Sequence, residues 1–289
     1  MIFRNDEPCF MGEPVTSVRK LSSGANNVYT VNNRFVYKEF ALPELCLTEA
    51  TALRLMGPTA TSTPTVIGNG NQTLTTNYVD GAKEAYEMLL RGDISSQQVN
   101  ALVSRFMLEQ YQLLLKGSIT EASALSWKTR LREIVLWWNI VGKTWCAHFP
   151  NQLDVLSQGL DVIVGLLPRL ESTALVHRDL HMSNLLLTDT RGYLDLTVID
   201  CEHALIGPIE LEFLNSRFWN DNKSLDVDAI IRILRTEYMV PFDVELEAHL
   251  MPFYIADQLL MAYKLINEDK RDKLLVKASE AFGWQPKVR

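Results

Sequence analysis

Short runs of β-branched and aromatic residues, separated by small polar segments, dominate about the first 76 residues of the chain. The clearest runs are residues 28–31, 34–40, 64–68 and 72–76. This pattern predicts strands joined by tight turns, with the last two runs forming a hairpin around Asn69-Gly70-Asn71. Residues 47–56 differ, because their apolar positions recur at helical spacing before Gly57-Pro58, and they predict one helix among the strands.

From Ala82 onward the apolar positions mostly follow a helical period. The predicted helices cover residues 95–115, 127–145, 153–170, 227–234 and 244–266. Three short apolar runs between them predict buried strands at 174–176, 185–187 and 196–199. The pattern therefore predicts an α+β chain with two parts: a strand-rich region at 1–81 and a mainly helical region at 82–289.

A lysine in the predicted strand at 34–40 requires partners for its charge. Phe35 and Tyr37 fall on one face of that strand, and Lys38 falls on the other with a core valine. A buried ammonium group is costly unless it is paired. Glu49 in the predicted helix can supply a carboxylate, and Glu44 is the alternative.

A turn of small polar residues precedes this strand. It contains Ser23, Gly24, Asn26 and Asn27. A turn of this composition allows backbone N–H groups to approach phosphate oxygens closely, although many such turns are ordinary hairpins.

The strongest chemical signal lies in residues 177–184, which read His-Arg-Asp-Leu-His-Met-Ser-Asn, and in Asp200, sixteen positions beyond Asn184. Phosphoryl transfer requires positioned oxygen ligands, a base and charge neutralisation around the phosphates. Asp179 suits the base that receives a hydroxyl proton. Asn184 and Asp200 are hard oxygen donors of the kind that magnesium prefers.

In this order, the segments resemble the aminoglycoside phosphotransferase and choline kinase-like family of small-molecule kinases, which has a bilobal protein-kinase-like fold. The matching segments are residues 22–29, 36–38, 48–50, 78–81, 177–184 and 199–204. The resemblance implies a small N-terminal sheet lobe with one helix at 1–81, including a hinge at 77–81, and a larger helical catalytic and substrate-binding lobe at 82–289.

The resemblance also implies roles for the residues that match. ATP and Mg²⁺ are the expected cofactors, with Asn184 and Asp200 holding the metal. Lys38 is expected to contact the α- and β-phosphates, and Glu49 to orient Lys38. The turn from Ser23 to Asn27, including Gly24 and Asn26, is expected to cover the triphosphate. The backbone of Asn77, Tyr78 and Val79 is expected to bind the adenine edge.

Some features depart from a protein kinase. His181 stands where protein kinases usually carry lysine, and Asp200 lies in Ile-Asp-Cys-Glu with no Ala-Pro-Glu after it. Arg178 still matches the arginine of the protein-kinase His-Arg-Asp motif.

The chain also lacks the aspartate that the small-molecule family often carries between Gly207 and Pro208. Glu210 and Glu212 are the candidates to replace it as a brace.

Composition limits the functional classes to which the protein can belong. A formal net charge of −7 argues against nucleic-acid binding and is compatible with a cationic substrate. The N-terminus is too polar for a signal peptide, and the strongest apolar stretch is too short to span a bilayer. The four cysteines are scattered, as expected of free thiols in the cytoplasm.

The predicted function is ATP-dependent transfer of the γ-phosphate to a hydroxyl of an amino-alcohol, an aminated sugar or a cationic antibiotic-like molecule. The alternatives are an atypical protein Ser/Thr kinase and a nucleotide-binding pseudokinase. Acidic candidates for a cationic group of the acceptor are Glu210, Glu212, Asp221, Asp226 and Asp257. The acceptor itself and the oligomeric state do not follow from the sequence.

Overall fold

The computed structural model describes residues 2–4, 7–23, 26–57, 63–115, 125–190, 192–221 and 225–281. The chain packs as two compact units. The first unit comprises Met1–Ser95 and Met182–Ala204, and the second comprises Ser96–His181 and Leu205–Arg289. Each unit is described by itself below.

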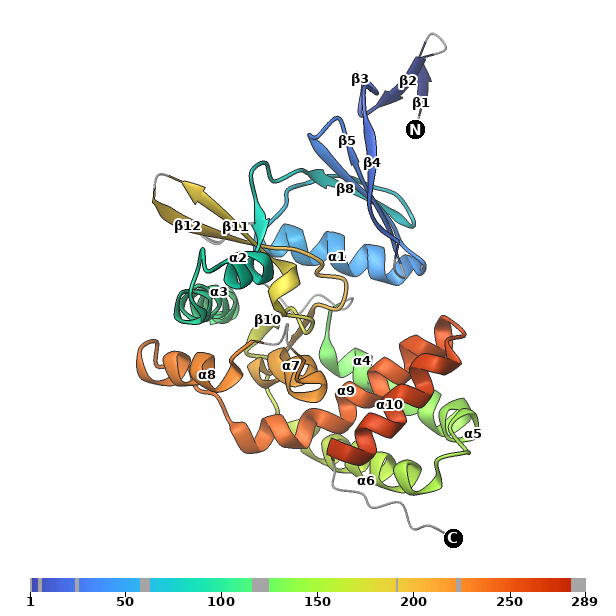
Figure 1. Cartoon of the computed structure of the whole chain (residues 1–289). Coiled ribbons are helices and arrows are strands. Elements are labelled where there is room, and N and C mark those ends of the chain that lie inside the picture. The colour runs from blue at the N-terminus through green and yellow to red at the C-terminus, as the bar shows by residue number, and fades with distance from the viewer. Residues whose placement is uncertain are drawn as a thin grey trace. The chain divides into compact units, whose positions relative to one another are not determined.

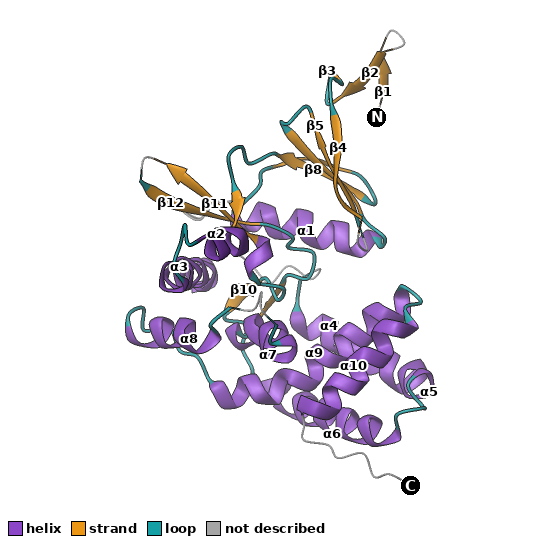
Figure 2. Cartoon of the chain, in the orientation of Figure 1, coloured by secondary structure: helices purple, strands orange, loops and turns teal. Residues whose placement is uncertain are grey.

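The first unit is built on a five-stranded antiparallel sheet of order β4-β5-β6-β8-β7 (Figures 1 and 2). Its strands are β4 (Val18–Ser23), β5 (Asn27–Val31), β6 (Phe35–Glu39), β7 (Val66–Asn69) and β8 (Thr73–Asn77). The predicted hairpin is therefore present as β7 and β8. A smaller sheet of β1 (Ile2–Arg4), β2 (Glu7–Phe10) and β3 (Glu13–Pro14) precedes it.

The two faces of β6 have different partners, as its alternation predicts. Phe35 and Tyr37 pack on Phe10, with ring centroids 5.7 Å and 5.6 Å from it. Lys38 lies on the other face, opposite Val28 of β5 and Leu74 of β8. Because β6 is the central strand, it pairs on both sides, with β5 and with β8.

Helix α1 (Pro43–Met56) connects β6 to β7 and packs against β7 and β8 (Figure 1). It begins earlier than predicted, because Pro43 occupies the first turn, where its missing N–H costs nothing. Leu45, Ala52, Leu53 and Met56 are among its buried residues, which explains the helical period of the sequence.

A third sheet, of order β12-β11-β9, completes the first unit. It consists of β9 (Lys83–Glu84), β11 (Leu185–Thr190) and β12 (Tyr193–Val198), and α2 (Ala85–Arg91) packs against it. The compact units thus divide differently from the predicted boundary after Gly81. Because Lys83 and Glu84 pair with Leu187 and Leu186, residues 82–95 and 182–204 group with the N-terminal sheet.

The second unit is mainly helical (Figure 2). Its helices are α3 (Ser96–Leu115), α4 (Trp127–Trp137), α5 (Lys143–Trp145), α6 (Pro150–Leu166), α7 (Leu214–Trp219), α8 (Val227–Thr236), α9 (Val244–Lys264) and α10 (Glu268–Ala281). A two-stranded sheet pairs β10 (Ala174–Val176) with β13 (Leu205–Gly207). The remaining predicted helices and strands all appear within a few residues of their expected positions.

Helix α9 is the core element of this unit and contacts α4, α6, α7 and α10. Asp243 caps its N-terminus by accepting hydrogen bonds from the backbone N–H groups of Glu245 and Leu246. Gly159 of α6 allows close approach, because a Cβ there would lie 2.5 Å from Pro252 Cγ. The stretch of α9 from Pro252 to Ala262 is buried throughout and forms the centre of this unit.

The helix predicted across residues 127–145 is interrupted by a π-helical segment at Trp138–Gly142. A Cβ at Gly142 would lie 2.8 Å from the Trp138 ring, so the wider turn and the glycine accommodate bulky indoles side by side. Among the described residues, no helix is long and apolar enough to cross a membrane.

Candidate active site

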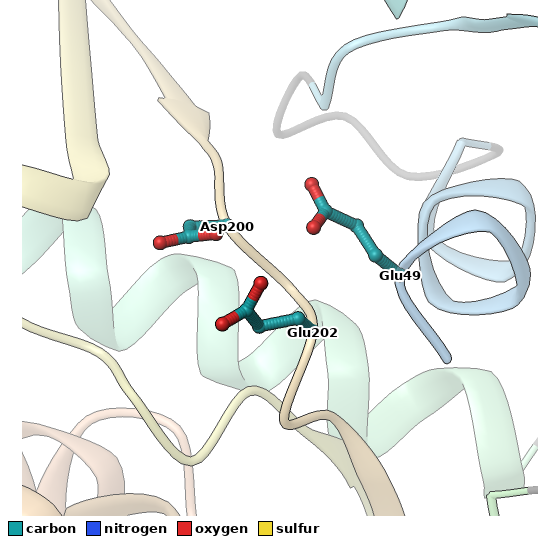
Figure 3. Close-up of side chains that lie close together, drawn as sticks. All are labelled: Glu49, Asp200 and Glu202. Carbon is teal, nitrogen blue, oxygen red and sulfur yellow. The ribbon is translucent and has the colours of Figure 1, made fainter. Parts of the chain in front are cut away.

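In the first unit, Lys38 is surrounded by carboxylates. Its ammonium Nζ lies 2.7 Å from Glu49 Oε2 and 2.9 Å from Glu202 Oε2, and it also donates a hydrogen bond to Asp200 Oδ1. The lysine is only 7% exposed. Figure 3 shows the three carboxylates gathered between α1 and the loop that follows β12. The predicted pairing of Lys38 with Glu49 is present, whereas Glu44 is exposed.

The three carboxylates outnumber the ammonium group, so two negative charges remain when all four groups are ionised. Burial favours a neutral Lys38, but Glu49, Asp200 and Glu202 outweigh burial and hold the pKa of Lys38 well above its usual value. Burial raises the pKa of Glu49 to about 7; Lys38 opposes this rise, and Asp200 and Glu202 add to it. Burial and Asp200 also raise the pKa of Glu202. The cluster therefore favours binding of further positive charge.

Glu202 also connects the cluster to the polar turn between β4 and β5. Asn26 Nδ2 donates to Glu202 Oε2 at 2.5 Å, and Asn26 Oδ1 accepts from the Ala41 N–H at 3.2 Å. Asn27, at the start of β5, donates more weakly to Glu39 at 3.4 Å. Gly24 lies outside the described residues, as does the side chain of Ser23, so their expected phosphate contacts stay a prediction.

The oxygen ligands for a divalent cation are close together. Single carboxylate oxygens of Glu49, Asp200 and Glu202 all lie within 4.8 Å of one another. The buried Asn184 sits in a 3-10 turn, and its backbone oxygen accepts from the Ile199 N–H at 3.0 Å, which joins it to the residue before Asp200. Asp200 itself adopts a left-handed backbone conformation with φ of 67°. This all-oxygen set fits Mg²⁺ and is unsuited to metals that prefer sulfur or imidazole.

The predicted hinge residues use part of their backbone within the protein. The Asn77 N–H donates to Thr65 O at 3.1 Å, and the Tyr78 N–H donates to Arg34 O at 2.8 Å. A nucleotide base therefore cannot accept a hydrogen bond from either N–H group without breaking a bond inside the first unit. The backbone of Val79 and the carbonyl groups of this segment stay candidates for base recognition.

In the second unit, Asp179 lies on the loop after β10. Its Oδ1 accepts a hydrogen bond from Asn215 Nδ2, and its Oδ2 lies 3.9 Å from His181 Nε2. His177 is fully buried, and its Nδ1 accepts the Asp179 N–H at 3.3 Å. His177 thus braces the backbone of the loop, and Asp179 keeps a partly exposed carboxylate.

Glu212 accepts hydrogen bonds from the backbone of the same loop. Its two carboxylate oxygens accept the backbone N–H groups of His177 at 2.7 Å and of Arg178 at 3.0 Å. Burial raises the pKa of Glu212 to about 7, against the lowering effect of these two bonds. Glu210 instead accepts the Asp243 N–H at 2.9 Å. Of the two glutamates considered as a brace, Glu212 is therefore the one that bonds to this loop.

Arg178 and the predicted acidic substrate residues have structural partners. Arg178 adopts φ of 68° and pairs with Asp257 Oδ2 at 2.6 Å, while Arg130 pairs with Oδ1 at 2.6 Å. Asp257 is 1% exposed, so the suggestion that it binds a substrate cation is wrong. Asp226 caps α8 by accepting the Ala229 N–H. With Glu210 and Glu212 also buried, Asp221 and Asp226 are the exposed members of the predicted set.

Comparison with known proteins identifies the family. A model of the phosphotransferase enzyme family matches residues 17–233, about three quarters of the chain. The chain belongs to this family. It is an enzyme that transfers a phosphoryl group to an alcohol. Comparison with curated protein sequences gives no significant match.

Solved aminoglycoside phosphotransferases share the fold of this phosphotransferase at low identity. The gentamicin complex of APH(2″)-IIa has 17% identity, covers 91% of each chain and superposes with a TM-score of 0.62. Its streptomycin–ATP ternary complex has 17% identity, covers 93% of each chain and superposes with a TM-score of 0.58. A GDP and kanamycin complex of a further APH(2″) enzyme has 14% identity, covers 93% of this chain and 94% of the other, and gives 0.64. The fold is therefore protein-kinase-like, as the resemblance implied.

The sequence motifs pointed to Lys38, Glu49 and Asp200, and the structure brings these three into contact. The ion pair of Glu202 with Lys38 was not predicted from the sequence. Asn215 was missed, because a single asparagine in a short helix carries no motif. Its role follows only from its bond to Asp179.

Proposed function

We propose that this phosphotransferase moves the γ-phosphoryl group of ATP to a hydroxyl of a cationic small molecule, with Mg²⁺ as cofactor. The observation that carries the proposal is the convergence of Glu49 and Asp200 on the Lys38 ammonium, because these residues come from a strand, a helix and a distant loop. Because ion pairs with carboxylates fix the position of this buried ammonium group, it is oriented to contact phosphate oxygens.

The residues take the following roles in this proposal. Asp179 accepts or orients the proton of the acceptor hydroxyl through its partly exposed carboxylate. Lys38 contacts the α- and β-phosphates, and Glu49 holds it in place. Asn184 and Asp200 hold magnesium, which, when bound, neutralises phosphate charge. Glu202 is a further oxygen donor beside Asp200.

A cationic acceptor is supported by two facts. The chain carries a formal net charge of −7, which attracts cations at long range. Three solved structures of two related enzymes contain gentamicin, streptomycin or kanamycin, all of them cationic amino sugars. ATP is supported by the streptomycin–ATP complex, whereas the GDP complex makes GTP the competing donor to test. We place the enzyme in the cytoplasm, where these nucleotides are supplied.

The test is a phosphorylation screen with purified full-length protein, Mg²⁺, and either ATP or GTP. Gentamicin, kanamycin, streptomycin, choline, ethanolamine, thiamine, homoserine and methylthioribose serve as acceptors, and mass spectrometry of the product detects the added phosphate. We expect one cationic acceptor to be phosphorylated by the wild type and not by Asp179→Ala. Phosphate incorporation into casein or into the enzyme itself, with none of these acceptors modified, would instead support a protein kinase. Nucleotide binding without any turnover would support a pseudokinase.

A further inference from the structure

A chain of side-chain hydrogen bonds ends at Asp179 in the second unit. Trp219 Nε1 donates to Tyr254 Oη at 3.1 Å, Tyr254 Oη donates to Asn215 Oδ1 at 2.7 Å, and Asn215 Nδ2 donates to Asp179 Oδ1. Asn215 and Trp219 lie at opposite ends of α7, while Tyr254 comes from the buried helix α9. Side chains of two helices, α7 and α9, thus connect the proposed base to the core.

The donors and acceptors in this chain have only one consistent direction. An indole N–H can donate and never accept, so Trp219 must occupy an acceptor position on the Tyr254 oxygen. The single Tyr254 proton then points to Asn215, which must present its carbonyl oxygen there. The Asn215 NH₂ group is consequently turned toward Asp179, whose Oδ1 accepts its hydrogen bond.

The burial of Tyr254 keeps the donors and acceptors of this chain in the same direction. Tyr254 is 2% exposed and packs on Phe218, with ring centroids 5.6 Å apart. Burial, with the Asp179 charge added, raises the pKa of Tyr254, so its hydroxyl keeps the proton that it donates. A buried tyrosine hydroxyl that lost its partners would be costly, which favours the fully bonded arrangement.

We propose that Asn215 is a positioning residue for catalysis, and that Tyr254 and Trp219 fix the orientation of its amide. Asn215 donates to Oδ1 of Asp179, and this bond fixes the direction in which the carboxylate is presented to the acceptor hydroxyl. This inference rests on the proposed role of Asp179 as the base. It adds to that role a means by which a flexible carboxylate is held in one rotamer.

The decisive variant is Asn215→Asp. It keeps the shape of the side chain and the acceptor for Tyr254, and it replaces the donor to Asp179 by a carboxylate oxygen that repels the Asp179 carboxylate. Asn215→Leu removes both functions. We expect both variants to lower kcat about 10- to 100-fold, the usual range for losing a hydrogen bond to a charged group, with KM for nucleotide and acceptor within about twofold of wild type.

Two further variants test the orienting residues. Tyr254→Phe lets the Asn215 amide rotate, and we expect a smaller loss of kcat, about 3- to 10-fold. Trp219→Phe allows the Tyr254 hydroxyl proton to point in another direction, and we expect it to lower kcat about two- to threefold. The matched control is Trp138→Phe, which removes an indole hydrogen bond to Ser157 of 3.0 Å elsewhere in the second unit and should leave kcat unchanged. Thermal unfolding verifies that each variant is folded.

The kinetics use the acceptor from the screen with the highest turnover, at saturating nucleotide and Mg²⁺. A folded Asn215→Asp enzyme with kcat within about twofold of wild type overturns the inference while leaving the proposed function intact. A wild-type kcat in Tyr254→Phe, beside an impaired Asn215→Asp, overturns the orienting role of Tyr254 and Trp219. A wild-type chain that phosphorylates no acceptor overturns the proposed function, and the inference with it.

Discussion

The brace formed by Glu212 predicts a measurable pH dependence of stability. Glu212 is buried and accepts two backbone N–H groups of the Asp179 loop, and burial raises its pKa from 4.5 to about 7. The perturbation is Glu212→Gln, which has nearly the same shape and no ionisable proton. One pKa unit corresponds to about 1.36 kcal/mol, so the shift corresponds to about 3 kcal/mol between the two ends of the titration.

The direction of the effect follows from proton binding. Below pH 4.5 the folded and unfolded chains both carry the Glu212 proton, and the pKa difference has no effect. Between pH 4.5 and about 7 the folded chain retains a proton that the unfolded chain has lost. Unfolding then releases a proton, so the contribution of Glu212 to the free energy of unfolding falls as pH rises through this window and is constant above it.

Urea unfolding at pH 5, 6, 7 and 8, followed by tryptophan fluorescence, measures this contribution. Residues 1–95 and 182–204 contain no tryptophan, so the signal reports the second unit, in which Glu212 lies. Relative to Glu212→Gln, the wild type should lose about 2–3 kcal/mol of unfolding free energy between pH 5 and pH 8. In Glu212→Gln the side-chain NH₂ group faces one of the two backbone N–H groups that the carboxylate accepts in the wild type. The resulting loss of stability is independent of pH.

The matched control is Glu171→Gln, which removes an exposed carboxylate from the same unit. Its unfolding free energy should follow the wild-type pH dependence, because an exposed carboxylate is hydrated in both states. A wild-type minus Glu212→Gln difference that stays constant within about 0.5 kcal/mol from pH 5 to pH 8 would refute the reasoning, since it would mean that Glu212 titrates alike in folded and unfolded chains.

The remaining predictions concern the proposed chemistry. Asp179→Ala should keep the wild-type melting temperature and lower kcat about 10²- to 10⁴-fold, because the hydroxyl proton loses its acceptor; steady-state kinetics that show full turnover would contradict the assignment. Asp200→Ala should remove the dependence of nucleotide binding on Mg²⁺, measured by calorimetry with and without EDTA, whereas an unchanged Mg²⁺ response would exclude Asp200 as a ligand. Lys38→Met should weaken binding of a fluorescent ATP analogue at least tenfold, because three carboxylates then face the phosphates without an ammonium group; wild-type affinity would remove Lys38 from the phosphate site.

Local pattern was sufficient for most elements of the fold. The alternation in β6 placed Phe35 and Lys38 on opposite faces, and the apolar spacing of residues 244–266 indicated the helix α9. Both are properties of residues close in sequence. Where the prediction differed from the structure, distant residues decided: pairing of β9 with β11 draws residues 82–95 into the first unit, and packed indoles widen the helix at Trp138–Gly142.

The candidate site divides in the same way. The amino-acid sequence by itself determined the chemical groups, because the spacing from Asp179 to Asn184 and Asp200, with a lysine in an early strand, is a local signature of phosphoryl transfer. It also determined the family to which the enzyme belongs.

Only the tertiary structure decided the partners of these groups. It selected Glu49 over Glu44 for Lys38, added Glu202, chose Glu212 as the brace, and connected Asn215 to Asp179. Asp200 lies 162 residues from Lys38, and Asn215 lies 36 residues from Asp179. The physical reason is that hydrogen bonds and ion pairs act over a few ångströms, so they depend on which distant segments the packed core brings together.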